Sequence, residues 1–203
     1  MFDTETFAAV ISMANNADIE PAALLAVAEV ESGGRALFPV ADKKEPAIRF
    51  EGHYFDRRLS GRIREQARQV GLASPEAGRV RNPKMQRERW LLLERAMSIH
   101  RQAALESTSW GLGQVMGAHW EWLGYRSIEE LVNEARSGVA GQVSLMLNFI
   151  DKAGLKASLQ AKDWRDFARR YNGPAFARNQ YDSRMAAAHE RWNRSLGHVL
   201  NAA

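Results

Sequence analysis

Apolar residues recur along most of this chain at the spacing of one helix face. Phe7, Val10, Ile11 and Ala14 lie three or four positions apart, which predicts a first helix over residues 4–14. A second helix is predicted from Pro21, which suits the first helical position, to Ser32, where two glycines follow. The same patterning predicts further helices over residues 84–105, 128–136, 138–151, 164–171 and 175–195, and one short helix is expected at 61–70 within a segment that lacks a clean period.

Two segments depart from helical patterning. In residues 36–51, short apolar stretches flank a charged tetrapeptide, which predicts an irregular β-hairpin. Most of residues 60–83 is rich in Arg, Gly, Ser and Pro without a clean period, which indicates a long basic loop. Repeats and linker-like stretches are absent from the sequence. We therefore expect one mainly α domain over residues 1–203, with at most one small sheet near 36–51.

Composition narrows the possible chemistry. The absence of cysteine excludes disulfides and cysteine-ligated metals, and the five histidines lack metal-binding spacing, so neither a metal nor another cofactor is expected. The acidic N-terminus does not resemble a secretory signal, and no apolar run is long enough to span a bilayer.

Charge is distributed unevenly. The net charge is +4, yet residues 57–102 carry twelve Lys and Arg against four Asp and Glu, whereas residues 1–56 carry four against ten. A basic surface predicts an anionic partner, such as nucleic acid, a membrane surface or a cell-wall polymer. The sequence contains no helix-turn-helix, zinc or RNP-like motif, so a nucleic-acid partner is not expected.

One carboxylate stands out within AVAEVESGG, residues 26–34. Glu31 shares a helix face with Leu24, Val27 and Ala28, whereas Glu29 points away from that face. A carboxylate on an apolar face is costly to desolvate unless it is paired or protonated, and a raised pKa suits a general acid. A solvated or ion-paired structural role is the alternative.

Three segments resemble motifs of goose-type lysozymes and lytic transglycosylases. ESGG, at 31–34, resembles the end of their catalytic helix. SWGLGQVM, at 109–116, resembles their GLMQ segment, and ARRYNGP, at 168–174, resembles their AYNxGP segment. Residues 50–55, 106–111 and 171–182 further resemble the N-acetylmuramidase domain of phage endolysins, and this resemblance extends over about residues 20–190.

The resemblance implies a lysozyme-like fold and an enzyme that cleaves the β-1,4 bond between N-acetylmuramic acid and N-acetylglucosamine. It implies a catalytic module alone, since the chain has no room for a separate cell-wall-binding domain. Without a recognised secretory signal, we expect a monomer that waits in the host cytoplasm and then acts on peptidoglycan. The charge distribution predicts that its basic surface faces the anionic envelope. A lytic transglycosylase, and a non-catalytic glycan-binding or virion protein, are the alternatives. The presence of Glu31 argues against the non-catalytic one.

Glycoside cleavage requires a proton donor, and a second carboxylate often orients water or stabilises the cation. Glu31 is the expected donor and Glu51 the expected partner, with Asp42 and Glu106 as alternatives. Glu106 could instead orient the glycine-rich segment. For substrate binding, the candidates are Gln114, Tyr171, Asn172 and Glu106. The indoles of Trp110 and Trp120 could stack on sugars, although tryptophan at such spacing is commonly core.

Overall fold

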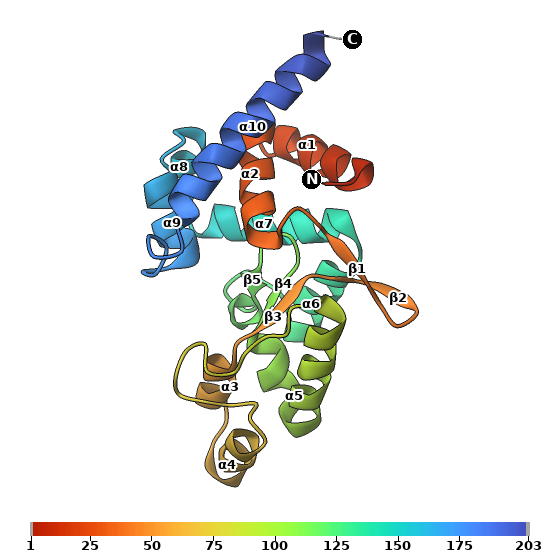
Figure 1. Cartoon of the computed structure of the whole chain (residues 1–203), viewed down its shortest axis with the longest axis vertical. Coiled ribbons are helices and arrows are strands. Elements are labelled where there is room, and N and C mark those ends of the chain that lie inside the picture. Colours follow the sequence, from red (N-terminus) through yellow and green to blue (C-terminus); the bar gives the residue numbers. More distant parts are fainter. Residues whose placement is uncertain (1, 202–203) are drawn as a thin grey trace.

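The apolar helix faces assemble into two hydrophobic cores. The computed structural model describes the backbone of residues 2–201 and the side chains of residues 2–197. One core lies among α1 (Thr4–Asn16), α2 (Pro21–Ser32), α7 (Val139–Lys152), α8 (Lys156–Gln160), α9 (Trp164–Asn172) and α10 (Tyr181–Asn201). We call this part the helical lobe; it is the upper part of Figure 1.

The second core belongs to a mixed lobe below it (Figure 1). Its helical elements are α3 (Gly52–Arg58), α4 (Gly61–Gln69), α5 (Gln86–Glu106), η1 (Gly117–His119) and α6 (Ile128–Arg136). Its sheet has the order β3 (Ile48–Phe50), β4 (Thr108–Trp110) and β5 (Val115–Met116), all antiparallel. Helix α7 joins the lobes, because Val143 and Met146 enter the first core and Leu145 enters the second.

Helix α2 is buried on nearly every side, which explains its almost entirely apolar sequence. Leu24 and Val27 are completely inaccessible, and α1 and α10 pack against this helix. Gly33 ends it in the left-handed conformation, with φ of 72°, where glycine avoids the strain of a Cβ. Glu29 lies on the α10 side, where it accepts hydrogen bonds of 2.6 Å from both Arg191 and Trp192. Glu31 is left to face the opposite direction.

The mainly α class and nearly all of the predicted helices are confirmed. Two helix caps are also present: the Ser127 hydroxyl accepts a hydrogen bond from the Glu130 N–H, and the Asp163 carboxylate accepts one from the Asp166 N–H. The last helix begins at Tyr181 rather than at 175, because residues 173–180 form turns that end at Gln180, with φ of 54°. Short helix α8 was not predicted.

The prediction of at most one sheet is wrong. Residues 36–51 form a hairpin of β1 (Leu37–Val40) and β2 (Lys43–Pro46), and then leave it to form β3. Strand β3 pairs with β4, about sixty residues further along the chain, in the register Ile48 to Trp110. No described helix combines the length and hydropathy needed to cross a membrane.

Candidate active site

A cleft of about 1240 Å³ separates the two lobes. The helical lobe contributes the end of α2, the end of α9 and the start of α10. The mixed lobe contributes β3, the start of α5 and the turn between β4 and β5, while β1 lines one side. Most of the sequence-predicted site residues lie on these walls, although they come from segments up to 141 positions apart. Among the described residues, no three His, Asp or Glu side chains cluster as metal ligands would.

Glu31 lies half-buried on the last turn of α2 and faces the cleft. Its Oε1 accepts a hydrogen bond of 2.6 Å from the Asn172 Nδ2 of α9. Burial raises the pKa of Glu31 to about 7, although the Asn172 hydrogen bond and the positive charge of Arg184 both favour the ionised form. At neutral pH this carboxyl group therefore exists in both protonation states, which suits a group that donates a proton and then recovers it.

Tyr171 joins two of the walls beside Glu31. Its hydroxyl donates a hydrogen bond of 2.6 Å to the Gly113 carbonyl, so the YNGP segment touches the glycine-rich segment directly. A Cβ on Gly113 would lie 2.8 Å from that hydroxyl, which explains the glycine there. The ring stacks on Phe167 and meets the edge of Phe149. Burial holds the pKa of Tyr171 well above its usual value, so the phenol remains a hydrogen-bond donor.

Gln114 lines the same cleft from the turn between β4 and β5. Its backbone is left-handed, with φ of 47°, and its side-chain Nε2 donates to the Gly111 and Ala47 carbonyls at 2.9 and 3.3 Å. The amide nitrogen is therefore used in shaping the turn. Within the described residues no hydrogen bond uses Oε1, so the predicted contact with sugar would be made through that oxygen.

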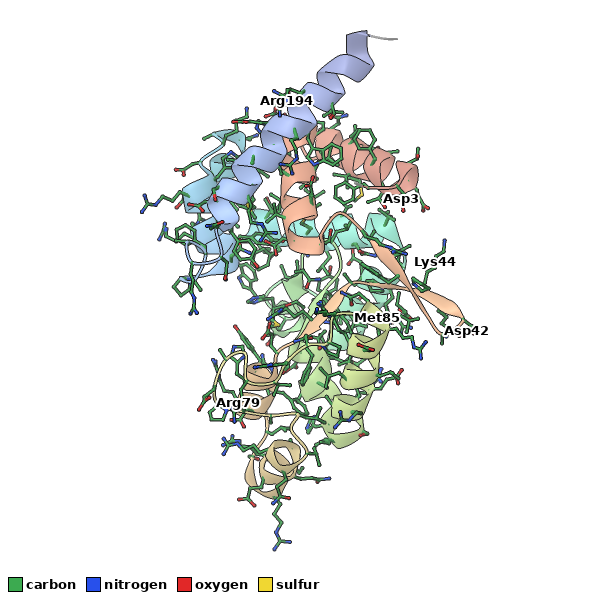
Figure 2. All side chains as sticks on the ribbon, viewed as in Figure 1. Asp3, Asp42, Lys44, Arg79, Met85 and Arg194 are labelled. Atoms are coloured by element: carbon green, nitrogen blue, oxygen red, sulfur yellow. The ribbon has the colours of Figure 1, made fainter. Side chains whose placement is uncertain are left out.

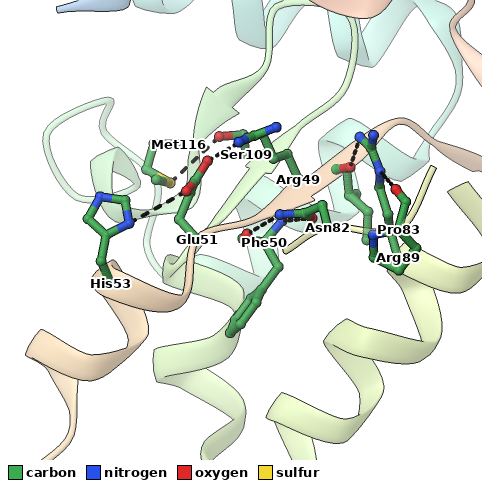
Figure 3. Close-up of polar contacts among 10 residues, drawn as sticks. Arg49, Phe50, Glu51, His53, Asn82, Pro83, Arg89, Ser109 and Met116 are labelled. Carbon is green, nitrogen blue, oxygen red and sulfur yellow. Dashed lines mark hydrogen bonds and ion pairs between the residues drawn. The ribbon is translucent and has the colours of Figure 1, made fainter. Parts of the chain in front are cut away.

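Glu51 lies on the mixed-lobe side, directly before α3, and also lines the cleft. The Arg49 Nε donates to Oε1 at 2.7 Å, and the His53 Nδ1 lies 3.5 Å from Oε2 (Figure 3). Burial lowers the pKa of His53, so its imidazole is mainly neutral at pH 7. Glu51 is 17% exposed, which leaves its carboxylate accessible from the cleft. The structure thus brings the two predicted catalytic carboxylates to one cavity.

The structure rejects a sugar-stacking role for Trp110. Its side chain is completely buried, packs edge-on against Trp90, and donates its indole N–H to the Leu105 carbonyl. The reason is the two-residue period of β4: Thr108 and Trp110 face the core, whereas Ser109 between them lines the cleft. This placement makes Trp110 a core residue of the mixed lobe.

Three other candidates also lie outside the cleft lining. Glu106 accepts hydrogen bonds from Arg58, Gln102 and the Trp120 indole, which agrees with the structural role beside the glycine-rich segment, and it does not line the cleft as a second carboxylate or a substrate-binding residue would. The same bond turns Trp120 toward Glu106. Asp42 is exposed at the far tip of the β1–β2 hairpin (Figure 2).

Most of the other cleft-lining residues were not predicted, and His119, Phe149, Tyr181 and Arg184 are among them. Phe149 lies on an apolar helix whose pattern indicates burial, and periodicity does not separate a core wall from a cleft wall. Tyr181 and Arg184 enter the site because α10 begins at the cleft, which is where the predicted helix boundary was wrong. The signal available for them was their position just after the YNGP segment.

A half-buried carboxyl group in a cleft between a helical lobe and a lobe with a small sheet is typical of the class of lysozyme-like glycosidases. Residues 20–193 match the Muramidase family, described as N-acetylmuramidase. The crystal structure of the Burkholderia AP3 phage endolysin matches with a TM-score of 0.75 and 33% identity, over 93% of this chain and 71% of that one. No curated protein matches the chain significantly. The chain belongs to the N-acetylmuramidase family and is a peptidoglycan hydrolase, a glycoside hydrolase with lysozyme activity.

Proposed function

We propose that this chain is an endolysin-type muramidase that hydrolyses the β-1,4 bond between N-acetylmuramic acid and N-acetylglucosamine, with Glu31 as the general acid. The observation that carries the proposal is the half-buried Glu31 carboxyl in the cleft, with a pKa raised to about 7. Such a group is protonated often enough at neutral pH to donate to the leaving glycosidic oxygen. The Asn172 amide holds the carboxyl in place and stabilises its anion after the proton has left.

Glu51 is the second carboxylate of this proposal. Its position on the opposite lobe, and the Arg49 side chain that holds it, support a role in directing water or in stabilising the oxocarbenium-like transition state. Without a useful second carboxylate, the 6-hydroxyl of the muramic acid would attack instead and leave a 1,6-anhydro end. Hydrolysis and transglycosylation therefore give different products, although Glu31 would be the general acid in both.

Mass spectrometry of digested peptidoglycan tests the bond and the reaction together. Reducing N-acetylmuramic acid ends are expected. Anhydro ends would replace hydrolysis by transglycosylation, and reducing N-acetylglucosamine ends would reject cleavage of this bond. For the acid, Glu31→Gln should lose roughly 100-fold or more in turnover. Glu29→Gln, two residues earlier on the same helix and bound to α10, is the matched control and should retain activity.

For the second carboxylate, Glu51→Gln should lower turnover by about 100-fold while folding normally, because Gln keeps the shape but not the charge. Asp42→Asn removes a carboxylate from the exposed hairpin tip and should change nothing. Anhydro ends from the Glu51→Gln variant would support water direction by Glu51. Full hydrolytic activity of that variant would remove Glu51 from the mechanism.

The setting of this activity is also part of the proposal. The chain would act as a monomer, wait in the host cytoplasm, and reach the wall once the cell membrane is opened. Its basic surface would then favour adsorption to the anionic envelope. Light scattering after size-exclusion chromatography tests the monomer, and binding to wall fragments at rising salt tests the adsorption, which should weaken as the salt rises.

A further inference from the structure

The basic segment found in the sequence enters the cleft itself. Among the residues that the structure describes, the cleft is lined by seven Lys or Arg side chains and by two carboxylates, Glu31 and Glu51. Three of the seven, Lys84, Arg87 and Arg89, come from the basic segment, residues 57–102. Glycosidic bond cleavage at Glu31 needs no such excess of positive charge, so the excess indicates an anionic feature of the substrate.

Some of these cations already have partners. Arg49 is paired with Glu51, and Arg89 donates to the Pro83 and Ile48 carbonyls (Figure 3). Arg170 is held by Asp166, and Arg184 donates to the Val30 carbonyl at 3.3 Å. These side chains support the walls of the cleft and are not free to meet a ligand.

Three cations remain directed toward solvent, and we call them the basic arm: Arg35, Lys84 and Arg87. Among the described residues, Lys84 and Arg87 make no side-chain hydrogen bond or ion pair, and both are exposed. Arg35 uses only its Nε, which donates to the Leu37 carbonyl, while its guanidinium lies 4.8 Å from the Phe38 ring centre. The terminal nitrogens of Arg35 are thus held in place and still available.

The basic arm lines the cleft from two elements that contact each other, since Arg35 precedes β1 and Lys84 and Arg87 lie at the start of α5. Arg35 follows α2 four positions after Glu31, and Phe38 of β1 lines the wall beside it. Lys84 and Arg87 flank Met85, which Figure 2 labels where β1 passes the start of α5. The arm therefore lies beside the path of a glycan strand that crosses Glu31, rather than on a remote face.

We propose that the basic arm binds the carboxylates of the peptide stems that the glycan strand carries, and that it thereby selects strands with free rather than amidated stem carboxylates. This inference rests on the proposed function. The N-acetylated sugars of the strand are uncharged, and the lactyl carboxyl of each substituted muramic acid is used in the amide bond to its stem. The negative charge of the strand therefore resides in the stems. Arg and Lys side chains form charge-assisted hydrogen bonds with carboxylates.

Two soluble substrates from one peptidoglycan preparation test the selection. Both have acetylated amines, and in one the carboxylates are converted to amides with carbodiimide and ammonia. Wild-type kcat/KM should be about tenfold lower on the amidated strands, mainly through KM, since exposed ion pairs each contribute modestly. Lys84→Gln/Arg87→Gln should lose about tenfold on the carboxylate strands and change little on the amidated ones.

The matched control is Arg79→Gln/Arg81→Gln, which removes two exposed cations of the same basic segment outside the cleft lining (Figure 2 labels Arg79). It should retain the wild-type preference. Equal losses in both double variants would overturn the proposal in favour of general attraction by net charge, and equal wild-type rates on both substrates would overturn it outright. In either case the cleavage products would be unchanged, so failure of the arm is distinct from failure of the muramidase assignment.

Discussion

Above neutral pH, the ionised Glu31 side chain destabilises the fold that holds it, because burial favours the protonated form. The pKa rises from an ordinary value of 4.5 to about 7 in the folded chain. Between these values the folded state binds one more proton than the unfolded state, so stability falls as the pH rises through this window. A shift of this size corresponds to about 3 kcal/mol, most of which is lost between about pH 5 and about pH 8.

Glu31→Gln removes this cost and keeps the shape of the side chain. Gln retains an oxygen that can accept from Asn172, so the packing of α2 against α9 should be preserved. We expect the variant to gain stability over the wild type progressively with pH, by about 3 kcal/mol when the two are compared above about pH 8 and below about pH 4.5. The same variant should lose catalysis, which is the trade between stability and activity expected for an acid held in a desolvated site.

Denaturant unfolding of both proteins from about pH 4.5 to about pH 8 measures this difference through the midpoint at constant slope. Glu29→Gln serves as the control, because it lies on the same helix but contacts α10, and it should retain the loss of stability with rising pH that Glu31 causes. If the stability difference between Glu31→Gln and wild type stayed constant across this range, the carboxyl would not titrate near neutrality. The electrostatic argument for Glu31 as an acid would then fail.

Three further changes probe the walls around this carboxyl. Gly113→Ala should lower the free energy of unfolding by about 1–3 kcal/mol and should lower turnover, because its Cβ would lie 2.8 Å from the Tyr171 hydroxyl. Unchanged stability and turnover would mean that Tyr171 can move aside and that this close approach is not required. Asn172→Ala removes a donor to the Glu31 carboxylate, so the alkaline limb of the activity profile should move to higher pH, and movement to lower pH would contradict the assigned hydrogen bond. Trp110→Ala should destabilise by about 3–5 kcal/mol as a buried aromatic, whereas Trp110→Phe should leave KM unchanged; a raised KM would restore a role in sugar binding.

The helices were predictable because their signals are local. Spacing of apolar residues, Pro21 at a helix start, Gly33 at its end and Ser127 as a cap each act within a few positions, and all appear in the structure. The sheet was not predictable in this way. Strand β3 has three residues and pairs with a segment about sixty positions later, so its stability comes from tertiary contacts that no local pattern records.

The site followed a similar division. Helix geometry singles out Glu31 as a candidate, since a polar residue among Leu24, Val27 and Ala28 is conspicuous, but its role as the expected acid came from the resemblance. Its surroundings, Tyr171 and Asn172, came from resemblance, because no spacing rule connects residues 141 positions apart. Trp110 was misplaced for lack of the strand assignment: once β4 is known, alternation turns it inward and Ser109 toward the cleft.

The two cores explain how Glu31, the proposed acid, can be half-buried and still face the cleft. Each lobe completes its own apolar interior, so the surface between them does not have to be closed for the chain to be stable. Helix α2 is fixed by burial along almost its whole length, and its last turn, after the apolar residues end, projects into that open surface. The free-energy cost of desolvating this one carboxyl group is therefore offset by the apolar residues that the rest of α2 buries. A carboxyl on a short, exposed element such as β1 would instead move toward solvent and recover its ordinary pKa.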